Sequence, residues 1–249
     1  MIRFENVSKK FGTFQVLNGV NLRFPKGKIS VVVGRSGAGK SVILKHIMGF
    51  LKPDSGKVFL DEQDTSNWDD LQWRETRKKF GMLFQDSALF DSMNVWENVA
   101  FPLLEHTNKS RDEIDEIVRR KLRLVGLVNA EMKNPSDLSG GMRKRVGLAR
   151  AIALDPEVVL FDEPSSGLDP IVTTVIDSLV LETQQETGCT YVVISHDMNS
   201  VYRIADKITM IYDGAVVIDA SPTEVKETKN PLVHQFVNGE LEGPFNIYY

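Results

Sequence analysis

The stretch Gly34-Arg35-Ser36-Gly37-Ala38-Gly39-Lys40-Ser41 fits the pattern G-x-x-x-x-G-K-[ST], which is typical of a loop that cradles phosphates. Its three glycines let the main chain turn tightly and bring N–H groups close to phosphate oxygens. The Lys40 amine can reach the β- and γ-phosphates of a nucleotide, and the Ser41 hydroxyl can ligate Mg²⁺. From average composition, a chance match is expected in on the order of 1% of chains of this length, so a phosphate-binding loop is favoured over an ordinary glycine-rich turn.

The residues on either side of this loop predict the elements that it needs. Ile29–Val33 is rich in β-branched side chains, which favours a buried strand. Residues 41–50 predict a helix, whose N-terminus favours a bound anion. A strand, a phosphate loop and a helix in this order indicate an α/β fold.

Composition narrows the class of protein. With 249 residues, 42% hydrophobic and 26% charged, the chain is typical of a soluble globular protein. Its net charge of −4 disfavours nucleic acid as a partner. The single cysteine, Cys189, cannot form an internal disulfide, and its apolar neighbours favour a buried structural thiol over a reactive one. No apolar run approaches membrane-spanning length and the start does not resemble a signal peptide, so we expect a cytosolic protein that reaches a membrane only through a partner.

Polar side chains follow three short apolar runs, at positions where the ends of parallel strands place ligands. Gln85 follows the first run, Asp162 and Glu163 follow the second, and His196 follows the third. Taken alone, Gln85 and His196 are compatible with ordinary loop residues. Paired with a phosphate loop, however, the two acids indicate a site in which Asp162 holds Mg²⁺ and Glu163 orients or deprotonates water.

Residues from about 86 to 155 change character, because helical patterns dominate and strand signals vanish. Arg111–Val125 predicts an amphipathic helix. Its charges are expected to form a solvated face that consists of Arg119, Arg120, Lys121 and Arg123. The apolar residues 88–90 and Met93 are compatible with either a docking surface or ordinary core packing.

Two further features leave alternatives open. Ser139 predicts the N-cap of a helix that runs to Leu154 and opens with Gly140-Gly141, so this helix start is either a second anion site or an ordinary cap. Phe11 lies upstream of the phosphate loop. It can stack on a nucleotide base or pack in the core, and the residues alone favour the core.

In this order along the chain, the phosphate loop, Gln85, Leu138–Met142, the acids with Asp169, and His196 resemble the nucleotide-binding subunit of ABC transporters. The resemblance covers nearly the whole chain. It implies a P-loop NTPase of the α/β class with a RecA-like core, an antiparallel β subdomain and an inserted helical subdomain. We therefore expect one nucleotide-binding domain over residues 1–239, with the helical subdomain at about 86–155 and a C-terminal tail at 240–249.

The resemblance also implies an ATPase that uses ATP and Mg²⁺, with two copies enclosing two ATP molecules. It assigns catalysis to Lys40, Gln85, Glu163 and His196. It assigns Mg²⁺ to Ser41, Gln85 and Asp162. It assigns ATP binding to Phe11, Gly34, Arg35, Ser36, Gly37, Ala38, Gly39, Lys40, Ser41, Val42, Ser139, Gly140, Gly141 and Asp169.

Three residues depart from the family pattern. Phe11 stands where tyrosine is usual, which keeps stacking and loses a hydroxyl. Met142 replaces a glutamine at the end of the signature, but the N–H groups of the two preceding glycines remain. Val42 replaces a second hydroxyl residue, while the Mg²⁺ ligand Ser41 is retained. These departures leave the predicted activity in place.

A narrower resemblance links residues 82–95, 138–143 and 234–239 to the ATPase of the Mla (maintenance of lipid asymmetry) phospholipid transporters. It implies an MlaE-type permease, MCE-domain and STAS-domain partners, and a place on the cytoplasmic face of the inner membrane. It also implies that the apolar tail, residues 240–249, reaches a neighbouring ATPase subunit.

Two alternatives remain open. One is an ABC subunit for another substrate, such as an amino acid. The other is a soluble ABC ATPase of translation or DNA repair, but those usually carry a second cassette or long coiled-coil or zinc insertions, which this chain lacks.

Overall fold

The computed structural model describes residues 1–244 of the chain. These residues form two compact units. The first consists of Met1–Asp69 with the chain from Val192 onward, and the second of Asp70–Tyr191. The predicted helical subdomain, at about residues 86–155, falls inside the second unit.

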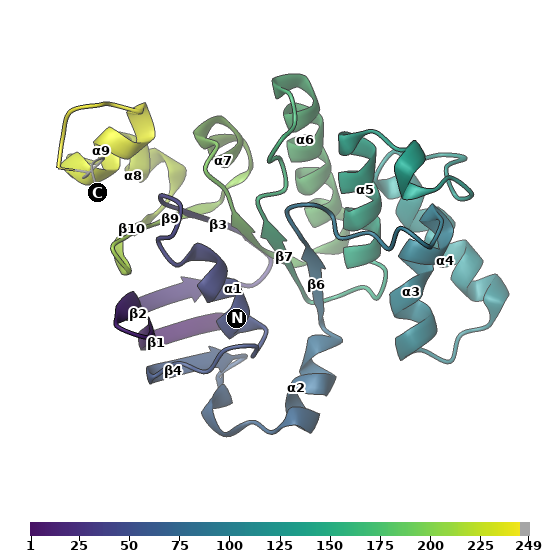
Figure 1. Cartoon of the computed structure of the whole chain (residues 1–249), viewed down its shortest axis with the longest axis horizontal. Helices are drawn as coiled ribbons and strands as arrows, with labels where there is room; N and C mark the ends of the chain where they lie inside the picture. Colours follow the sequence, from purple (N-terminus) through teal and green to yellow (C-terminus); the bar gives the residue numbers. More distant parts are fainter. Residues whose placement is uncertain (245–249) are drawn as a thin grey trace. The chain divides into compact units, whose positions relative to one another are not determined.

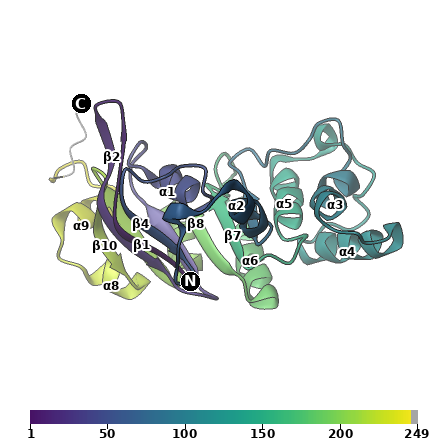
Figure 2. The ribbon, with the colours of Figure 1, turned by 90° about the horizontal axis from the view of Figure 1, so that it is seen from below.

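The first unit contains an antiparallel sheet with the strand order β2-β1-β4-β5. Its strands are β1 (Ile2–Phe11), β2 (Phe14–Phe24), β4 (Ser55–Leu60) and β5 (Gln63–Asp64). Figure 2 shows β1 and β2 as a long hairpin. Phe4 and Phe24 point to the buried face of this hairpin, where their rings meet edge to face at 6.2 Å.

Parallel pairing places the predicted strand before the phosphate loop inside the first unit. All residues of β3 (Ile29–Val33) are buried, as predicted, and β3 pairs in parallel with β9 (Lys207–Tyr212). β9 continues through Asp213-Gly214 into the antiparallel β10 (Ala215–Ala220). The Ser195 N–H donates to the Val32 carbonyl at 3.3 Å, so the chain leaves β8 (Thr190–Ile194) beside the end of β3.

The helices of the first unit begin at residues that favour helix starts. They are α1 (Lys40–Ile47), α7 (Met198–Ile204), α8 (Pro222–Glu227) and α9 (Pro231–Asn238), with a 3-10 turn at Thr65–Asn67. In α8, Ser221 and Glu224 form a reciprocal capping box around a proline at the first helical position. Such short-range contacts stabilise the helix start.

His46 on α1 makes the stability of the first unit depend on pH. It is buried, and its Nδ1 donates to the Val42 carbonyl at 2.7 Å, so Nε2 is the unprotonated nitrogen and has no hydrogen-bond partner among residues 1–244. Burial lowers the pKa of His46 in the folded state. In an unfolded chain the pKa of this histidine is about 6.5. Just below that pH, the unfolded chain therefore binds a proton that the folded chain does not bind.

We expect the melting temperature to fall as pH drops from about 7 to about 5, since protonation of the unfolded state begins near pH 6.5. In His46→Leu this fall should be smaller, because the variant has no such proton to take up. Thermal melts of both proteins at several pH values measure the difference. If the melting temperatures of both proteins fall equally with pH, the pKa of His46 does not differ between the folded and the unfolded chain.

The second unit combines a parallel strand pair with helices. Its elements are α2 (Asp70–Arg77), β6 (Phe80–Leu83), α3 (Val95–His106), α4 (Arg111–Leu124), α5 (Gly140–Ala151), β7 (Val158–Asp162) and α6 (Pro170–Thr187), with a 3-10 turn at Pro135–Asp137. β6 and β7 are parallel, and α3, α4 and α5 pack on one another (Figure 1). Residues 86–155 contain no strand, as predicted.

The amphipathic helix α4 is confirmed, but one of its charges lies inside. Ile114, Val118 and Leu122 are buried at helical spacing. The prediction that Lys121 belongs to a solvated face is wrong, because its side chain is buried and its ammonium pairs with Asp155. A buried ammonium needs such a partner to offset the loss of hydration.

Cys189 is a buried thiol, as predicted. Its Sγ donates to the Pro156 carbonyl at 2.8 Å, and burial raises the pKa of the thiol. These contacts favour the neutral, unreactive form. Within residues 1–244, no helix combines the length and apolar character needed to cross a membrane.

Candidate nucleotide site

The phosphate loop joins β3 to α1, and at two of its glycines there is no room for a side chain. Gly34 and Gly39 have positive φ values of 148° and 95°. A Cβ on Gly34 would lie 2.3 Å from the Ile211 carbonyl oxygen, and one on Gly39 would lie 2.9 Å from the Val16 carbonyl oxygen. Any side chain at either position would therefore displace neighbouring main chain.

Lys40 is the first residue of α1 and is buried. Its ammonium donates to the carbonyl oxygens of Gly34 at 2.8 Å and Arg35 at 2.9 Å. Ser41 is exposed and Val42 is half-buried at the same helix start. The loop thus carries a positive charge held by its own carbonyls, next to a helix N-terminus that favours anions.

Phe11 and His196 also belong to the first unit. Phe11, at the end of β1, is 48% exposed, so the core-packing interpretation is wrong and the ring is available for stacking. The Lys9 ammonium lies 5.8 Å from the centre of this ring. His196 is exposed and lies just beyond β8, as the sequence predicted.

In the second unit, the ends of β6 and β7 bring the polar residues close together. The parallel register pairs Leu83 with Phe161, and Gln85 and Glu163 each follow two residues later. Asp162 is the last residue of β7, and Glu163 has a positive φ of 50°, which is uncommon outside glycine. Gln85 Nε2 donates to Ser166 Oγ at 3.4 Å. The carboxyl ends of both strands therefore carry the predicted side chains.

Two helix starts complete the predicted set in this unit. Ser139 caps α5, because its Oγ accepts a hydrogen bond from the Met142 N–H at 3.3 Å, and Gly140 and Gly141 form the first turn. Asp169 caps α6 and accepts from two main-chain N–H groups, both at 3.0 Å. The cap at Ser139 agrees with the sequence prediction, and the structure adds the cap at Asp169.

The sequence analysis missed Lys144, which lies on α5 and is buried. Burial lowers the pKa of Lys144, and the carboxylates of Asp86 and Glu163 oppose this effect. A sequence signal existed: Lys144 shares a helical stripe with buried residues three and four positions away, Gly141 and Leu148. A lysine in such a stripe indicates a specific partner.

An apolar groove of about 390 Å³ lies in the second unit beside Gln85. Its lining includes Phe80, Met82, Phe84, Phe90, Phe101 and Leu154. Phe84 and Phe90 are 43% and 40% exposed, and the rings of Phe90 and Phe101 lie 4.8 Å apart. The apolar residues near position 90 thus form an open surface rather than a closed core.

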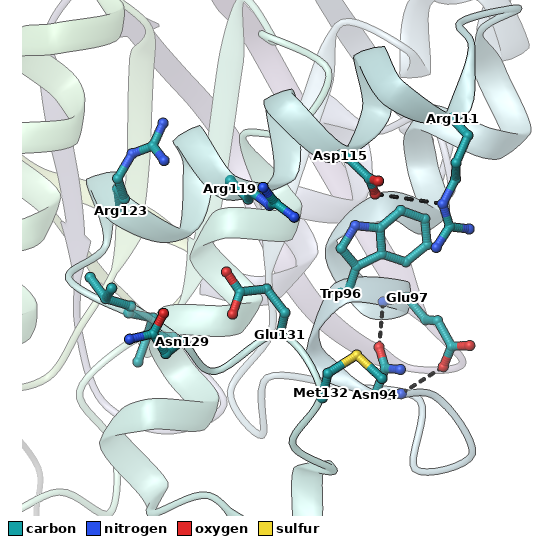
Figure 3. Close-up of a pocket in the computed structure, with 12 residues that line it drawn as sticks. Asn94, Trp96, Glu97, Arg111, Asp115, Arg119, Arg123, Asn129, Glu131 and Met132 are labelled. Atoms are coloured by element: carbon teal, nitrogen blue, oxygen red, sulfur yellow. Dashed lines mark hydrogen bonds and ion pairs between the residues drawn. The ribbon is translucent and has the colours of Figure 1, made fainter.

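A larger hollow of about 750 Å³ lies between the starts of α3 and α4 and the segment after α4 (Figure 3). There, the Arg111 guanidinium stacks 3.5 Å above the Trp96 ring and pairs with Asp115 at 3.5 Å. The charged lining consists of Arg111, Arg119, Arg123, Glu97, Asp115 and Glu131. These charges balance, and none of the predicted nucleotide-site residues lines this hollow, so we do not assign it to the nucleotide.

The family model described as "ABC transporter" matches residues 17–166, which include the phosphate loop, the signature and the acids of β7. The chain belongs to the ABC transporter family. It is therefore an ABC ATPase with the P-loop NTPase fold, as the sequence predicted.

Individual relatives of this ABC ATPase are also ATP-binding proteins. It is 41% identical over 249 residues to the intermembrane phospholipid transport system ATP-binding protein MlaF of Haemophilus influenzae, covering 100% of this chain and 94% of that protein. It is 42% identical over 247 residues to the probable ribonucleotide transport ATP-binding protein mkl of Mycobacterium tuberculosis strain H37Rv, covering 99% and 68%. The dimeric ATP-binding cassette MJ0796, solved with ADP and Pi, matches 89% of this chain and 99% of that chain, with a TM-score of 0.80 and 32% identity.

Proposed function

We propose that this ABC ATPase powers phospholipid transport through a membrane permease, at the cytoplasmic face of the inner membrane. The choice of phospholipid as the cargo rests on the similarity of this chain to MlaF of H. influenzae, which extends over almost the full length of both chains. The motif residues 82–95, which set the Mla resemblance apart, include the groove residues Phe84 and Phe90. Sequence likeness and an open apolar surface therefore coincide.

In each copy, the motif residues have separate roles in phosphoryl transfer. The loop Gly34–Ser41 and Lys40 hold the phosphates, and the Phe11 ring stacks on the base. Glu163 orients and deprotonates the attacking water, and Gln85 and His196 assist at the γ-phosphate. Asp169 and the signature Ser139–Gly141 complete the site, and Arg35 to Ala38 and Val42 contribute loop and helix contacts. The Lys40 ammonium donates to carbonyls of its own loop, which supports this assignment, because phosphate oxygens are better acceptors for an ammonium and can take their place.

The donor set fits Mg²⁺. Ser41 offers a hydroxyl, Asp162 a carboxylate and Gln85 an amide oxygen, and all of these are hard oxygen ligands. A few protein oxygens suffice for this ion, since Mg²⁺ is usually shared with the phosphates of the substrate. When bound, the ion would neutralise charge on the β- and γ-phosphates.

We expect two copies to complement each other, because the signature of one copy is proposed to complete the site of the other. A mixture of Lys40→Ala and Gly140→Asp proteins should regain about a quarter of the wild-type activity, since half of randomly mixed dimers are heterodimers and each keeps one intact site. Gly140→Asp is suited to the test because a Cβ there meets only Leu168 Cδ2 at 3.4 Å and Arg143 at 4.0 Å. ATP hydrolysis of the mixture is measured against each variant alone.

A mixture without activity would mean either that both sites must be intact together or that the signature does not act across a dimer. Cysteines at Ser139 and Ser36 separate these outcomes. A disulfide between two copies in the presence of ATP supports the shared site, and its absence contradicts it. The native Cys189 is buried and does not compete.

The apolar groove is proposed as the surface that receives a segment of the permease. Phe90→Ala should weaken co-purification of the permease about tenfold or more, because an exposed aromatic side chain that the permease segment would bury is lost. Leu104→Ala is the matched control, since Leu104 is 50% exposed on the same helical part of the chain but does not line the groove. Equal permease recovery with both variants would place the contact elsewhere.

The partners beyond the permease follow the Mla resemblance: an MCE-domain protein and a STAS-domain protein. The tail, residues 240–249, is proposed to reach the neighbouring ATPase subunit, but residues 245–249 lie outside the described part of the chain. In the described part, the Glu240 N–H donates to the Gln235 carbonyl of α9 at 3.0 Å, and Leu241 is 85% exposed. The start of the tail is thus held against α9, and the exposed Leu241 that follows is compatible with docking on another subunit.

A second candidate is transport of ribonucleotides, because the mycobacterial mkl relative carries that name at 42% identity. The two candidates differ in the chemistry of the cargo. A phospholipid requires an apolar path in the permease, whereas a ribonucleotide requires a polar one.

The deciding experiment uses the native complex, purified from membranes through a tag on this chain and placed in vesicles. ATP hydrolysis and movement of labelled phospholipid are measured together, with labelled ribonucleotide uptake as the parallel assay. Phospholipid movement that requires ATP supports the proposal. Ribonucleotide uptake without lipid movement supports the second candidate, and a chain that is purified with ribosomes or DNA and without a permease contradicts both.

A further inference from the structure

Lys144 lies at the point where the signature helix α5 meets the segment after β6. Its side chain is 5% exposed, and its ammonium donates to the main-chain carbonyl of Gln85. A lysine is rarely buried without a partner, because its charge must be stripped of water. This contact therefore fixes the main chain at the residue proposed to assist at the γ-phosphate.

A second cation of α5 holds the same segment. The Arg150 guanidinium donates to the carbonyls of Ser87 at 2.7 Å and Ala88 at 2.8 Å. Together, Lys144 and Arg150 bind three of the four carbonyls from Gln85 to Ala88. Helix α5 is thus bound to this segment through charge-assisted hydrogen bonds, which are stronger than neutral ones.

The segment needs this support. Ser87 and Ala88 both have positive φ values, 62° and 45°, which cost non-glycine residues free energy and persist only when surrounding contacts hold them. Gly147 lets α5 approach closely, because a Cβ there would lie 2.6 Å from Leu83 Cδ1 and 3.3 Å from Ser87 Cβ. Loss of a cation from α5 would therefore free the segment to relax.

The position of Gln85 matters because Glu163 occupies the corresponding place after β7. The register of β6 and β7 sets these two residues two positions past the pair Leu83 and Phe161. Lys144 is also within electrostatic reach of the Glu163 carboxylate. One ammonium thus touches the main chain at one proposed catalytic residue and acts on the charge of the other.

We propose that Lys144 is a positioning residue for ATP hydrolysis, which holds the main chain at Gln85 so that the Gln85 side chain stays in register with Glu163. The inference rests on the proposed roles of these two residues. It implies that Lys144 affects turnover through Gln85, with little effect on ATP binding, since the phosphate loop belongs to another part of the chain.

The test compares kcat and KM for ATP among Lys144→Met, Lys144→Arg and Lys121→Met. Lys144→Met should lower kcat about tenfold with KM changed less than about twofold, because a charged hydrogen bond that positions a catalytic group is lost. Lys144→Arg should restore most of kcat, since a guanidinium can donate to the same carbonyl. Lys121→Met removes another buried lysine of the second unit and should lower the melting temperature while keeping kcat.

A double-mutant cycle shows whether Lys144 acts through Gln85. In a Gln85→Ala background, Lys144→Met should cause no further loss of kcat, because the side chain that it positions is gone. Independent, additive losses would overturn the inference, as would an unchanged kcat in Lys144→Met. If Lys144→Met does not fold, Lys144→Gln, which removes the charge and keeps a donor, takes its place in the same cycle.

The proposed role of Gln85 and the inference about Lys144 can fail separately. If Gln85→Ala alone keeps wild-type hydrolysis, the proposed role of Gln85 is wrong and the inference is lost with it. If Gln85→Ala lowers kcat but Lys144→Met does not, the proposed site stands and the inference alone is wrong.

Discussion

Glu163→Gln is expected to lower ATP turnover by about 10²–10⁴-fold while leaving ATP binding nearly unchanged, because it removes the proposed general base and keeps the shape of the side chain. The phosphate loop and Lys40 are untouched by this change. ATP that binds but is not hydrolysed should hold the two copies together, so the variant should elute as a dimer in ATP. Phosphate release, a nucleotide titration and size-exclusion chromatography measure the three effects.

Glu157→Gln is the matched control. Glu157 immediately precedes β7, whereas Glu163 immediately follows it, and Glu157 is exposed and pairs with Lys79 at 3.0 Å. Surface ion pairs of this kind contribute little, so this variant should keep wild-type turnover. Wild-type turnover in Glu163→Gln would show that another group activates the water.

Lys40→Ala is expected to weaken ATP binding by about 100-fold and to abolish measurable hydrolysis, since the proposed charged contact to the phosphates is lost. The variant also leaves the Gly34 and Arg35 carbonyls without the ammonium that donates to them. A loop that loses both its charge and its internal hydrogen bonds cannot present its N–H groups in the same place. A binding titration with a fluorescent nucleotide measures the affinity.

Lys45→Ala is the control for this prediction, because Lys45 is an exposed lysine on the same helix, α1. It should bind ATP as the wild type does. A thermal melt of Lys40→Ala establishes that the first unit remains folded. Unchanged affinity in a folded Lys40→Ala protein would mean that this loop does not hold the phosphates.

Local chain geometry explains what could be predicted. The phosphate loop and the helix cap at Ser139 each depend on residues within a few positions of one another. Hydrogen bonds and φ values within such short segments follow from residue type. The positions of the polar residues after strands were predictable for the same reason. A buried strand ends where its apolar run gives way to a polar or charged residue.

Side chains whose surroundings come from distant segments could not be predicted in this way. Lys121 was expected in solvent but pairs with Asp155, 34 positions away, and Phe11 was favoured in the core but is exposed. Lys144 reaches the carbonyl of Gln85 across 59 positions. No local pattern determines which of two amphipathic surfaces a long side chain will meet.

The sequence by itself therefore determined the family, the strand, glycine-rich loop and helix at residues 29–47, and the order of the motifs proposed to act in catalysis, because these depend on short-range constraints on the main chain. Only the tertiary structure decided that α5 binds the segment after β6 through two cations and that the phenylalanines around position 90 line an open groove. Both depend on the packing of helices against strands, where burial and desolvation of each group are set by neighbours remote in the chain.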